Sequence, residues 1–277
     1  MKDPLVTVEW LKQHLNEVVV LDATYYLSAD PERIRADFKT LRILGAALFE
    51  IDEICDKNSD LPNMLPSDNY FSEAMARMGV DASAPIVVYD RSANHFSASR
   101  VWLTLKLFGL TDCYVLNGGL NPWIESGGKT ETGETRLNPV DPRHWMLESA
   151  RVVSGEQMSE YVRSGRETIL DARSRERFDG LVPEPRPGLP SGHVPGAVSV
   201  PFTTLTYADG FFMPPEVFQE RFATVGDGEP IVSCGSGITA CVLALGLERI
   251  GKQSRLYDGS WIEWGRGHLG PIDTSSS

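Results

Sequence analysis

The sequence predicts an α/β fold made of two copies of one domain, each a parallel sheet flanked by helices. Helical patterns alternate with short apolar runs along the 277 residues, and this alternation is typical of parallel sheets covered on both faces. A helix start followed by an apolar run ending in aspartate occurs at 7–22 and again at 154–171. The two aspartates, Asp22 and Asp171, are 149 residues apart (171 − 22), which indicates a tandem duplication.

The elements of the first copy have counterparts in the second, in the same order. Thr7 is placed to cap a helix whose apolar face contains Trp10 and Leu11, and the run 18–23 that follows has the pattern of a buried strand. The other matching segments are 43–48 with 194–199, 85–90 with 230–234, and 115–119 with 256–260. Four ordered matches at a nearly constant offset are not expected by chance.

The domain boundaries are predicted from a change in composition. A proline-rich, charged stretch at 138–143 separates the two copies, and such stretches are typical of linkers. We therefore expect an N-terminal domain over 1–138, a linker over 139–150 and a C-terminal domain over 151–277.

Composition limits the partners and the setting. The net charge of −12 argues against nucleic acid or an anionic membrane surface as a partner, although local arginines can still bind a small anion. The four cysteines form no CxxC pair and no metal-binding spacing, which favours a reduced, cytoplasmic setting without a metal. No apolar signal segment is apparent at the N-terminus, and no apolar run is long enough to span a membrane.

The stretch 230–241 carries the strongest chemical signal. Cys234 begins a short loop between an apolar strand and a helix, and Gly235 and Gly237 allow the positive φ angles that turn successive backbone N–H groups toward one point. The positive end of the helix dipole adds to that point, so a thiol there should ionise more easily than a free one, whose pKa is about 8.5. Cys234 is therefore a candidate nucleophile, with an inert buried cysteine as the alternative. Cys241, inside the apolar helix, is interpreted as a core residue.

The first copy lacks this loop. It has Asp90 at the position of the cysteine, followed by the residues 91–95, which contain no glycine. An aspartate cannot perform thiolate chemistry, so we expect the C-terminal copy to be active and the N-terminal copy to close the site.

These motifs resemble those of the two-domain rhodanese-like sulfurtransferases, most closely the members that use 3-mercaptopyruvate. The matching segments are Cys234–Cys241, Ser191–Ala197, Pro183–Arg186 and Tyr257–Trp264. The resemblance covers nearly the whole chain and implies tandem rhodanese-like domains, a catalytically inactive first domain and no cofactor.

The resemblance also implies a reaction. Cys234 would attack the sulfur of 3-mercaptopyruvate, release pyruvate and become a persulfide, which a thiol acceptor such as thioredoxin, or cyanide, then discharges. Inward-pointing N–H groups would stabilise the persulfide anion. The loop residues implied to bind substrate are Gly235, Gly237, Ile238 and Thr239.

Further residues take roles by the same resemblance. Arg177 and Arg186 would bind the substrate carboxylate, because a guanidinium can bind a carboxylate through two hydrogen bonds. Ser236 and Asp52 would form a proton relay. Asn63 stands where relatives often have a histidine, and it can donate a hydrogen bond but cannot become cationic.

Three alternative functions match the residues of this chain less closely. Thiosulfate-preferring relatives have Arg and Lys directly after the cysteine, whereas Gly235 and Ser236 are neutral; thiosulfate sulfurtransferase is therefore the nearest alternative. A cysteine phosphatase needs an arginine at position 240, where this chain has Ala240. A non-catalytic persulfide carrier would have no need of Arg177 and Arg186.

Overall fold

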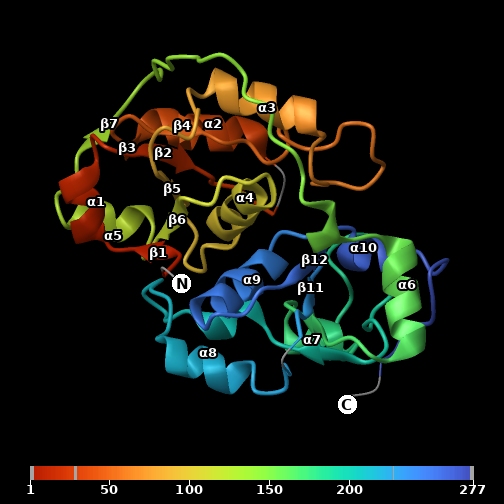
Figure 1. Cartoon of the computed structure of the whole chain (residues 1–277). Helices are drawn as coiled ribbons and strands as arrows, with labels where there is room; N and C mark the ends of the chain where they lie inside the picture. Colours follow the sequence, from red (N-terminus) through yellow and green to blue (C-terminus); the bar gives the residue numbers. More distant parts are fainter. Residues whose placement is uncertain (1–2, 28–29, 227, 275–277) are drawn as a thin grey trace.

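The computed structural model describes residues 3–27, 30–226 and 228–274, and these residues form two similar halves that face each other (Figure 1). Each half contains a five-stranded parallel sheet. The first sheet has the order β1 (Leu5–Val6), β6 (Cys113–Leu116), β5 (Ile86–Tyr89), β2 (Val19–Asp22) and β4 (Ala47–Leu48). The second has the order β8 (Val152–Val153), β12 (Arg255–Tyr257), β11 (Ile231–Ser233), β9 (Ile169–Asp171) and β10 (Ala197–Ser199). Strands that match in chain order also match in sheet order, which confirms the predicted α/β duplication.

Helices cover both faces of each sheet. Those of the first half are α1 (Val8–His14), α2 (Pro31–Thr40), α3 (Asp68–Arg77), α4 (Phe96–Leu107) and α5 (Leu120–Glu125). Those of the second half are α6 (Gly155–Ser164), α7 (Arg175–Phe178), α8 (Pro215–Arg221), α9 (Ala240–Arg249) and α10 (Ser260–Trp264), with short 3₁₀ turns η1 (Ser149–Arg151) and η2 (Phe202–Leu205). A small antiparallel pair, β3 (Arg42–Ile43) and β7 (Thr130–Glu131), completes the first half.

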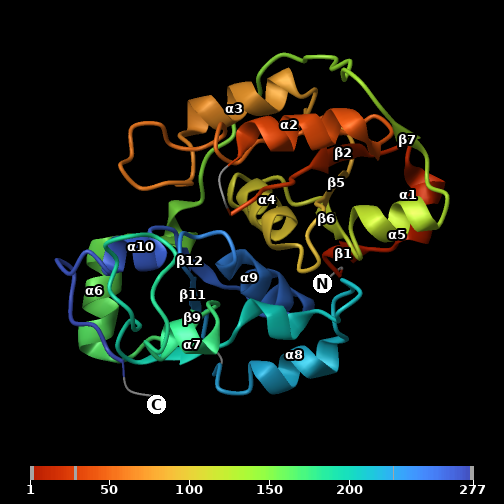
Figure 2. The same cartoon turned by 180° about the vertical axis from the view of Figure 1, so that it is seen from behind.

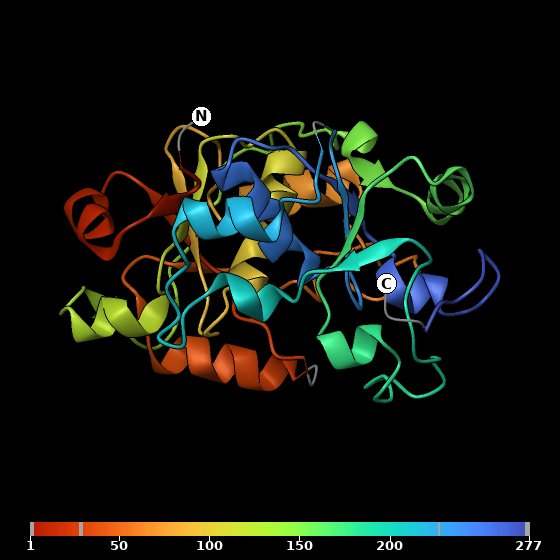
Figure 3. The ribbon, with the colours of Figure 1, turned by 90° about the horizontal axis from the view of Figure 1, so that it is seen from below.

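One hydrophobic cluster spans both halves, and each half has a smaller cluster of its own on the opposite face of its sheet. Alternate side chains of each sheet point to opposite faces, and the faces that carry α4 and α9 are turned toward each other, so that Val101 and Leu105 belong to the same buried cluster as Cys241 and Leu245. In the view from below, α4 (yellow) and α9 (blue) meet in the middle, while α1 and α6 lie at opposite ends (Figure 3). Because burial of apolar area is the main stabilising contribution, the halves are held in a fixed relation.

The predicted helix starts are confirmed by their caps. The hydroxyl of Thr7 accepts a hydrogen bond from the N–H of Trp10 at 3.1 Å. At the equivalent place in the second half, Ser154 and Gln157 form a reciprocal capping box, which satisfies two N–H groups that a helix start leaves without partners.

Each half also extends a loop to the other. The N–H of Phe212 in the second half donates to Asn117 Oδ1 at 2.9 Å, and the N–H of Leu65 in the first half donates to Asp258 Oδ2 at 2.7 Å. Phe212 and Leu65 each lie three residues before a helix (215 − 212 and 68 − 65), and Asn117 and Asp258 each directly follow a strand. The halves are therefore related by an approximate two-fold axis that also relates their contacts.

The segment between β7 and η1 connects the halves along the outside of α3 (Figures 1 and 2). The N–H of Trp145 donates to Ser72 Oγ at 3.0 Å and that of Leu147 to Asp68 Oδ1 at 2.9 Å. The boundaries at 138 and 151 stay a prediction. Along the described ranges, every helix falls short of the length and apolar character needed to cross a membrane.

Candidate active site

Cys234 and Asp90 occupy equivalent positions in the two halves. Cys234 directly follows β11 and Asp90 directly follows β5, and the helices α9 and α4 begin after the same interval (240 − 234 and 96 − 90, six residues). Both therefore lie at the carboxyl end of a central strand, where ligands bind in sheets of this kind. The Cys234 side chain is buried, with 1% of the residue exposed.

The N–H groups of the loop after Cys234 are left without protein acceptors among the described residues. Its outer side is held by α10: the N–H of Cys234 donates to Ser260 Oγ at 3.1 Å, and the carbonyls of Cys234 and Gly235 accept from Trp261 and Ile262 at 3.0 and 2.9 Å. Within the described residues, the N–H groups of residues 235–240 donate to no protein acceptor. Successive free N–H groups at a helix start form a binding site for an anion.

In the first half, the corresponding backbone N–H groups bind a carboxylate of the protein itself. Asp90 Oδ2 accepts from the N–H groups of Ser97 and Ala98 at 3.2 and 2.9 Å, and Oδ1 accepts from the N–H of Ser92 at 3.0 Å. Burial opposes ionisation of Asp90, but His95 and the backbone donors outweigh it, so the pKa of this carboxyl is lowered. The loop of the first half therefore binds the Asp90 carboxylate, whereas the loop of the second half has free N–H donors and the Cys234 thiol.

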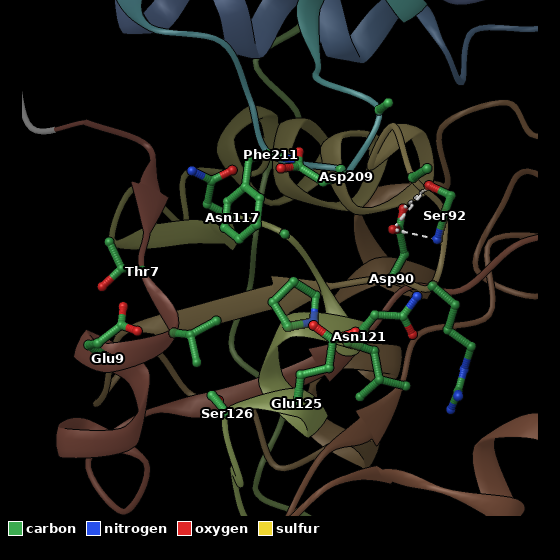
Figure 4. Close-up of a pocket in the computed structure, with 18 residues that line it drawn as sticks. Thr7, Glu9, Asp90, Ser92, Asn117, Asn121, Glu125, Ser126, Asp209 and Phe211 are labelled. Atoms are coloured by element: carbon green, nitrogen blue, oxygen red, sulfur yellow. Dashed lines mark hydrogen bonds between the residues drawn. The ribbon is translucent and has the colours of Figure 1, made fainter.

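A large cavity of about 900 Å³ lies beside Asp90 (Figure 4). Phe211 projects into it from the second half, with Glu9 on one side and Asp90 on the other. Its lining contains no cysteine among the described residues, and the loop donors next to it already bind Asp90. Size alone therefore does not locate the chemistry.

A smaller cavity, of about 220 Å³, lies beside Cys234. Its lining brings together most of the residues that the sequence singled out, namely Arg177, Arg186, Cys234, Gly235, Ser236, Ile238 and Thr239. Asp52, Asn63 and Gly237 do not line it. Gly237 turns toward the other side of the loop, since a Cβ on it would lie 2.7 Å from the carbonyl oxygen of Asp258.

Arg177 is held in place by Glu184, a residue that sequence reasoning did not assign. Arg177 Nε donates to Glu184 Oε1 at 3.1 Å and Nη2 donates to Oε2, while Arg173 Nη1 donates to the same carboxylate at 2.9 Å. A Cβ on Gly235 would lie 3.2 Å from Arg177 Nη2. Arg177 therefore packs directly over the cysteine loop with its charge largely matched by Glu184.

Arg186 has no such partner: among the described residues it makes no ion pair within 4.0 Å. It nevertheless acts on two groups of the first half. Burial raises the pKa of Asp52 and of Tyr25, and the charge of Arg186 opposes both increases. Asp52 and Tyr25 thus lie within electrostatic range of Arg186, which lines the cavity beside Cys234. Within the described ranges, no hydrogen bond joins Asp52 to Ser236.

Asn63 occupies a strained and buried position. Its φ angle is 62°, in the left-handed region, and 4% of the residue is exposed. Its carbonyl accepts from Arg100 Nη2 at 2.6 Å, and both amide atoms of its side chain are buried with no hydrogen-bond partner among the described residues. Such strain and unpaired polar atoms are typical of functional sites.

The interpretation of Cys241 as a core residue agrees with its surroundings. It is fully buried, and this burial raises the pKa of its thiol to about 12. Its Sγ donates to the carbonyl of Gly237 at 3.2 Å. Among the described residues, His, Cys, Asp and Glu side chains form no group of three placed to bind a metal ion.

Comparison with known proteins places this geometry in a family. The rhodanese-like domain family matches residues 7–126 and 154–266, one match in each half and each including its central loop. The chain belongs to the rhodanese family. Both halves are thus rhodanese domains, as the motifs predicted.

The names of individual relatives indicate the type of reaction within this family. The 3-mercaptopyruvate sulfurtransferase of Homo sapiens is 37% identical and the match covers 94% of this chain and 91% of the relative. Thiosulfate/3-mercaptopyruvate sulfurtransferase 2 of Arabidopsis thaliana is 35% identical over 99% of this chain and 88% of its own length. The crystal structure of SseA from Escherichia coli, a 3-mercaptopyruvate sulfotransferase with the rhodanese fold, superposes with a TM-score of 0.83 at 32% identity, covering 94% and 99% of the two chains. This rhodanese is accordingly a sulfurtransferase.

Proposed function

We propose that the protein transfers sulfur from 3-mercaptopyruvate through a persulfide on Cys234 and releases pyruvate. The observation that carries this proposal is the juxtaposition of a thiol, a loop of free N–H groups and two arginines around one cavity of about 220 Å³. The thiol supplies the nucleophile, the loop stabilises an anionic sulfur and the arginines bind a carboxylate. The name of the human relative supports this choice of donor.

The first step forms an S–S bond and breaks a C–S bond. The Cys234 thiolate attacks the substrate sulfur, and the electron pair of the C–S bond moves to the carbon, where the neighbouring ketone takes it up as an enolate. Protonation of that carbon gives pyruvate, and the sulfur stays on Cys234 as a persulfide. The N–H groups of residues 235–240 stabilise the sulfur anion without rearranging, because the folded loop already holds them in position.

The two arginines have unequal roles in substrate binding. Glu184 holds Arg177 by two hydrogen bonds over the cysteine loop, which fixes the direction of its remaining donors. Arg186, without an ion pair among the described residues, supplies the unmatched positive charge. Together they orient the substrate carboxylate so that its sulfur faces Cys234.

Proton delivery to the leaving carbon is assigned to Ser236 and Asp52. Ser236 lines the cavity next to Cys234. Burial raises the pKa of Asp52, and a carboxyl with a raised pKa is a better proton donor near neutral pH. The relay then passes through the bound substrate, since the two side chains share no direct hydrogen bond.

The second step returns the enzyme to its starting state. The thiolate of an acceptor, for which a protein such as thioredoxin is the expected type, attacks the outer sulfur of the persulfide and leaves Cys234 as a thiolate; cyanide takes the same sulfur as thiocyanate. A cytoplasmic setting is proposed with it, because a reducing environment keeps such thiols available.

Thiosulfate is the second candidate donor, because the Arabidopsis thaliana relative is named for both donors. The test measures pyruvate release from 3-mercaptopyruvate with a dithiol acceptor, beside thiocyanate formation from thiosulfate and cyanide, with Cys234→Ser as the blank. We expect turnover of mercaptopyruvate that the serine variant lacks. Faster turnover of thiosulfate would show that thiosulfate, and not 3-mercaptopyruvate, is the sulfur donor. A persulfide on Cys234 without release of pyruvate would show that the protein is a persulfide carrier.

A further inference from the structure

Arg100 connects three separate segments of the chain around the catalytic loop. It lies on α4 of the first domain, with 4% of its side chain exposed. Its Nη1 donates to the carbonyl of Gly237 at 3.1 Å and to Asp258 Oδ1 at 2.6 Å. Its Nη2 donates to the carbonyl of Asn63 at 2.6 Å. A residue of the inactive domain thus contacts the cysteine loop of the active one.

The bond to Gly237 determines how one peptide of the loop is turned. In a trans peptide the C=O and the following N–H point in opposite directions. The Gly237 carbonyl points to Arg100 and to the Cys241 thiol, so the N–H of Ile238 points away from both of them. This N–H is one of the free donors of the loop.

The space around Gly237 shows how closely the two domains approach here. A Cβ on Gly237 would lie 2.7 Å from Asp258 O and 3.2 Å from Arg100 Nη1, and its φ angle is 77°. The loop therefore needs a glycine in the left-handed region. The guanidinium fills the space on the outer side of the peptide.

We propose that Arg100 is a positioning residue of the active site, which holds the Gly237–Ile238 peptide with its N–H directed at the sulfur on Cys234. This inference rests on the proposed function, because the stabilised group is the persulfide anion. A donor fixed before the reaction stabilises the developing charge without reorganisation. The same guanidinium holds the carbonyl of Asn63, so one side chain sets both the cysteine loop and a strained residue of the opposite domain.

The test must separate positioning from stability, since removing one partner of a buried ion pair is destabilising in itself. Lys106 provides the matched control. It lies on the same helix, and its Nζ donates to Glu248 Oε1 on α9 at 2.8 Å, so Lys106→Met also removes an ion pair between the domains but touches no residue of the cysteine loop. Both Arg100→Met and Lys106→Met are compared with the wild type.

Three quantities are measured in each protein: kcat and KM for pyruvate release, and the rate at which iodoacetamide alkylates Cys234 at pH 7. We expect kcat of Arg100→Met to fall about 10- to 100-fold, the size of effect that a misplaced catalytic group produces. KM changes less than about twofold, because Arg177 and Arg186 still bind the carboxylate. Alkylation slows as well, whereas Lys106→Met keeps the wild-type values of all three.

Equal kcat and equal alkylation rates in the two variants would overturn the inference and leave Arg100 with a structural role. If Arg100→Met does not fold, Arg100→Lys is measured instead: a lysine keeps a charge for Asp258 but lacks the fork that reaches both carbonyls, so kcat falls at constant KM. If the wild type releases no pyruvate, the proposed function fails, and the alkylation rates still decide the role of Arg100.

Discussion

Replacing Arg186 with glutamine removes the cation of the substrate cavity that has no ion pair among the described residues. Arg177 already gives two of its hydrogen bonds to Glu184, so the substrate carboxylate gains more from Arg186. Hydrogen bonds to a charged group contribute about 1.5–3 kcal/mol, and this range corresponds to a factor of about 10–150 in affinity. Arg186→Gln should therefore raise KM for mercaptopyruvate about 10- to 150-fold while kcat changes little.

The assay is the initial rate of pyruvate release over a range of substrate concentrations, at low salt and at about 0.15 M salt, where charges are screened beyond about 8 Å. Arg166→Gln is the control, because Arg166 is exposed in the same domain and its loss changes the net charge equally. The KM of Arg186→Gln should also depend less on salt than that of the wild type. A KM no higher than that of Arg166→Gln would refute the assignment of the carboxylate to Arg186.

Three further predictions follow from individual residues. In Asn63→His a titratable ring enters a buried position next to the Tyr25 hydroxyl, so KM for mercaptopyruvate should vary with pH between about 6 and 9. A constant difference from the wild type over that range would contradict this. Gly237→Ala places a Cβ 2.7 Å from Asp258 O. Its control is Gly109→Ala, because Gly109 has a φ angle of 85° but nothing within 4 Å of an added Cβ, so this change should lower the free energy of unfolding in urea by only about 1–2 kcal/mol. Gly237→Ala should lower it by more, and equal losses would show that the cysteine loop can move to make room for the Cβ. Burial lowers the pKa of His95, but Asp90 and the Gly210 carbonyl outweigh it and the net pKa is raised, so its stabilising contribution is complete below about pH 6.5 and is lost as the pH rises through the folded value. Urea unfolding of His95→Asn should then change less over that interval than unfolding of the wild type, and parallel curves would exclude His95 as the cause.

Much of the site could be predicted from local patterns. Cys234 follows an apolar strand and precedes a helix, and strand ends in a parallel sheet meet at one edge, so its position was readable from the sequence. The glycines at 235 and 237 predicted a curled loop, and the structure shows the free N–H groups. Gly237 has the expected positive φ, but Gly235 does not, so the prediction of positive φ at both glycines was wrong for Gly235. The proton relay between Ser236 and Asp52 stays a prediction.

The contrast between the two loops shows what a pattern omits. The sequence indicated that Asp90 cannot act as a nucleophile. The structure adds that its carboxylate folds back onto the N–H groups of Ser97 and Ala98. This arrangement depends on a side-chain conformation and on His95 behind it, neither of which a spacing rule describes.

The sequence by itself determined the fold and the duplication, because periodicity and capping residues act over a few neighbouring positions. The nucleophile Cys234 was predicted from its loop, and Arg177 and Arg186 from the family resemblance; these roles stay predictions. Tertiary structure alone decided that Glu184 holds Arg177 and that Arg100, 134 residues before Cys234 (234 − 100), donates a hydrogen bond to the cysteine loop at Gly237. Arg177 and Glu184 meet within the second half, whereas Arg100 reaches the cysteine loop only when the two sheets are assembled and α4 packs against α9. Long-range pairs of buried charges depend on that assembly, since the free energy that holds them comes from the low dielectric and the geometry of the finished interface.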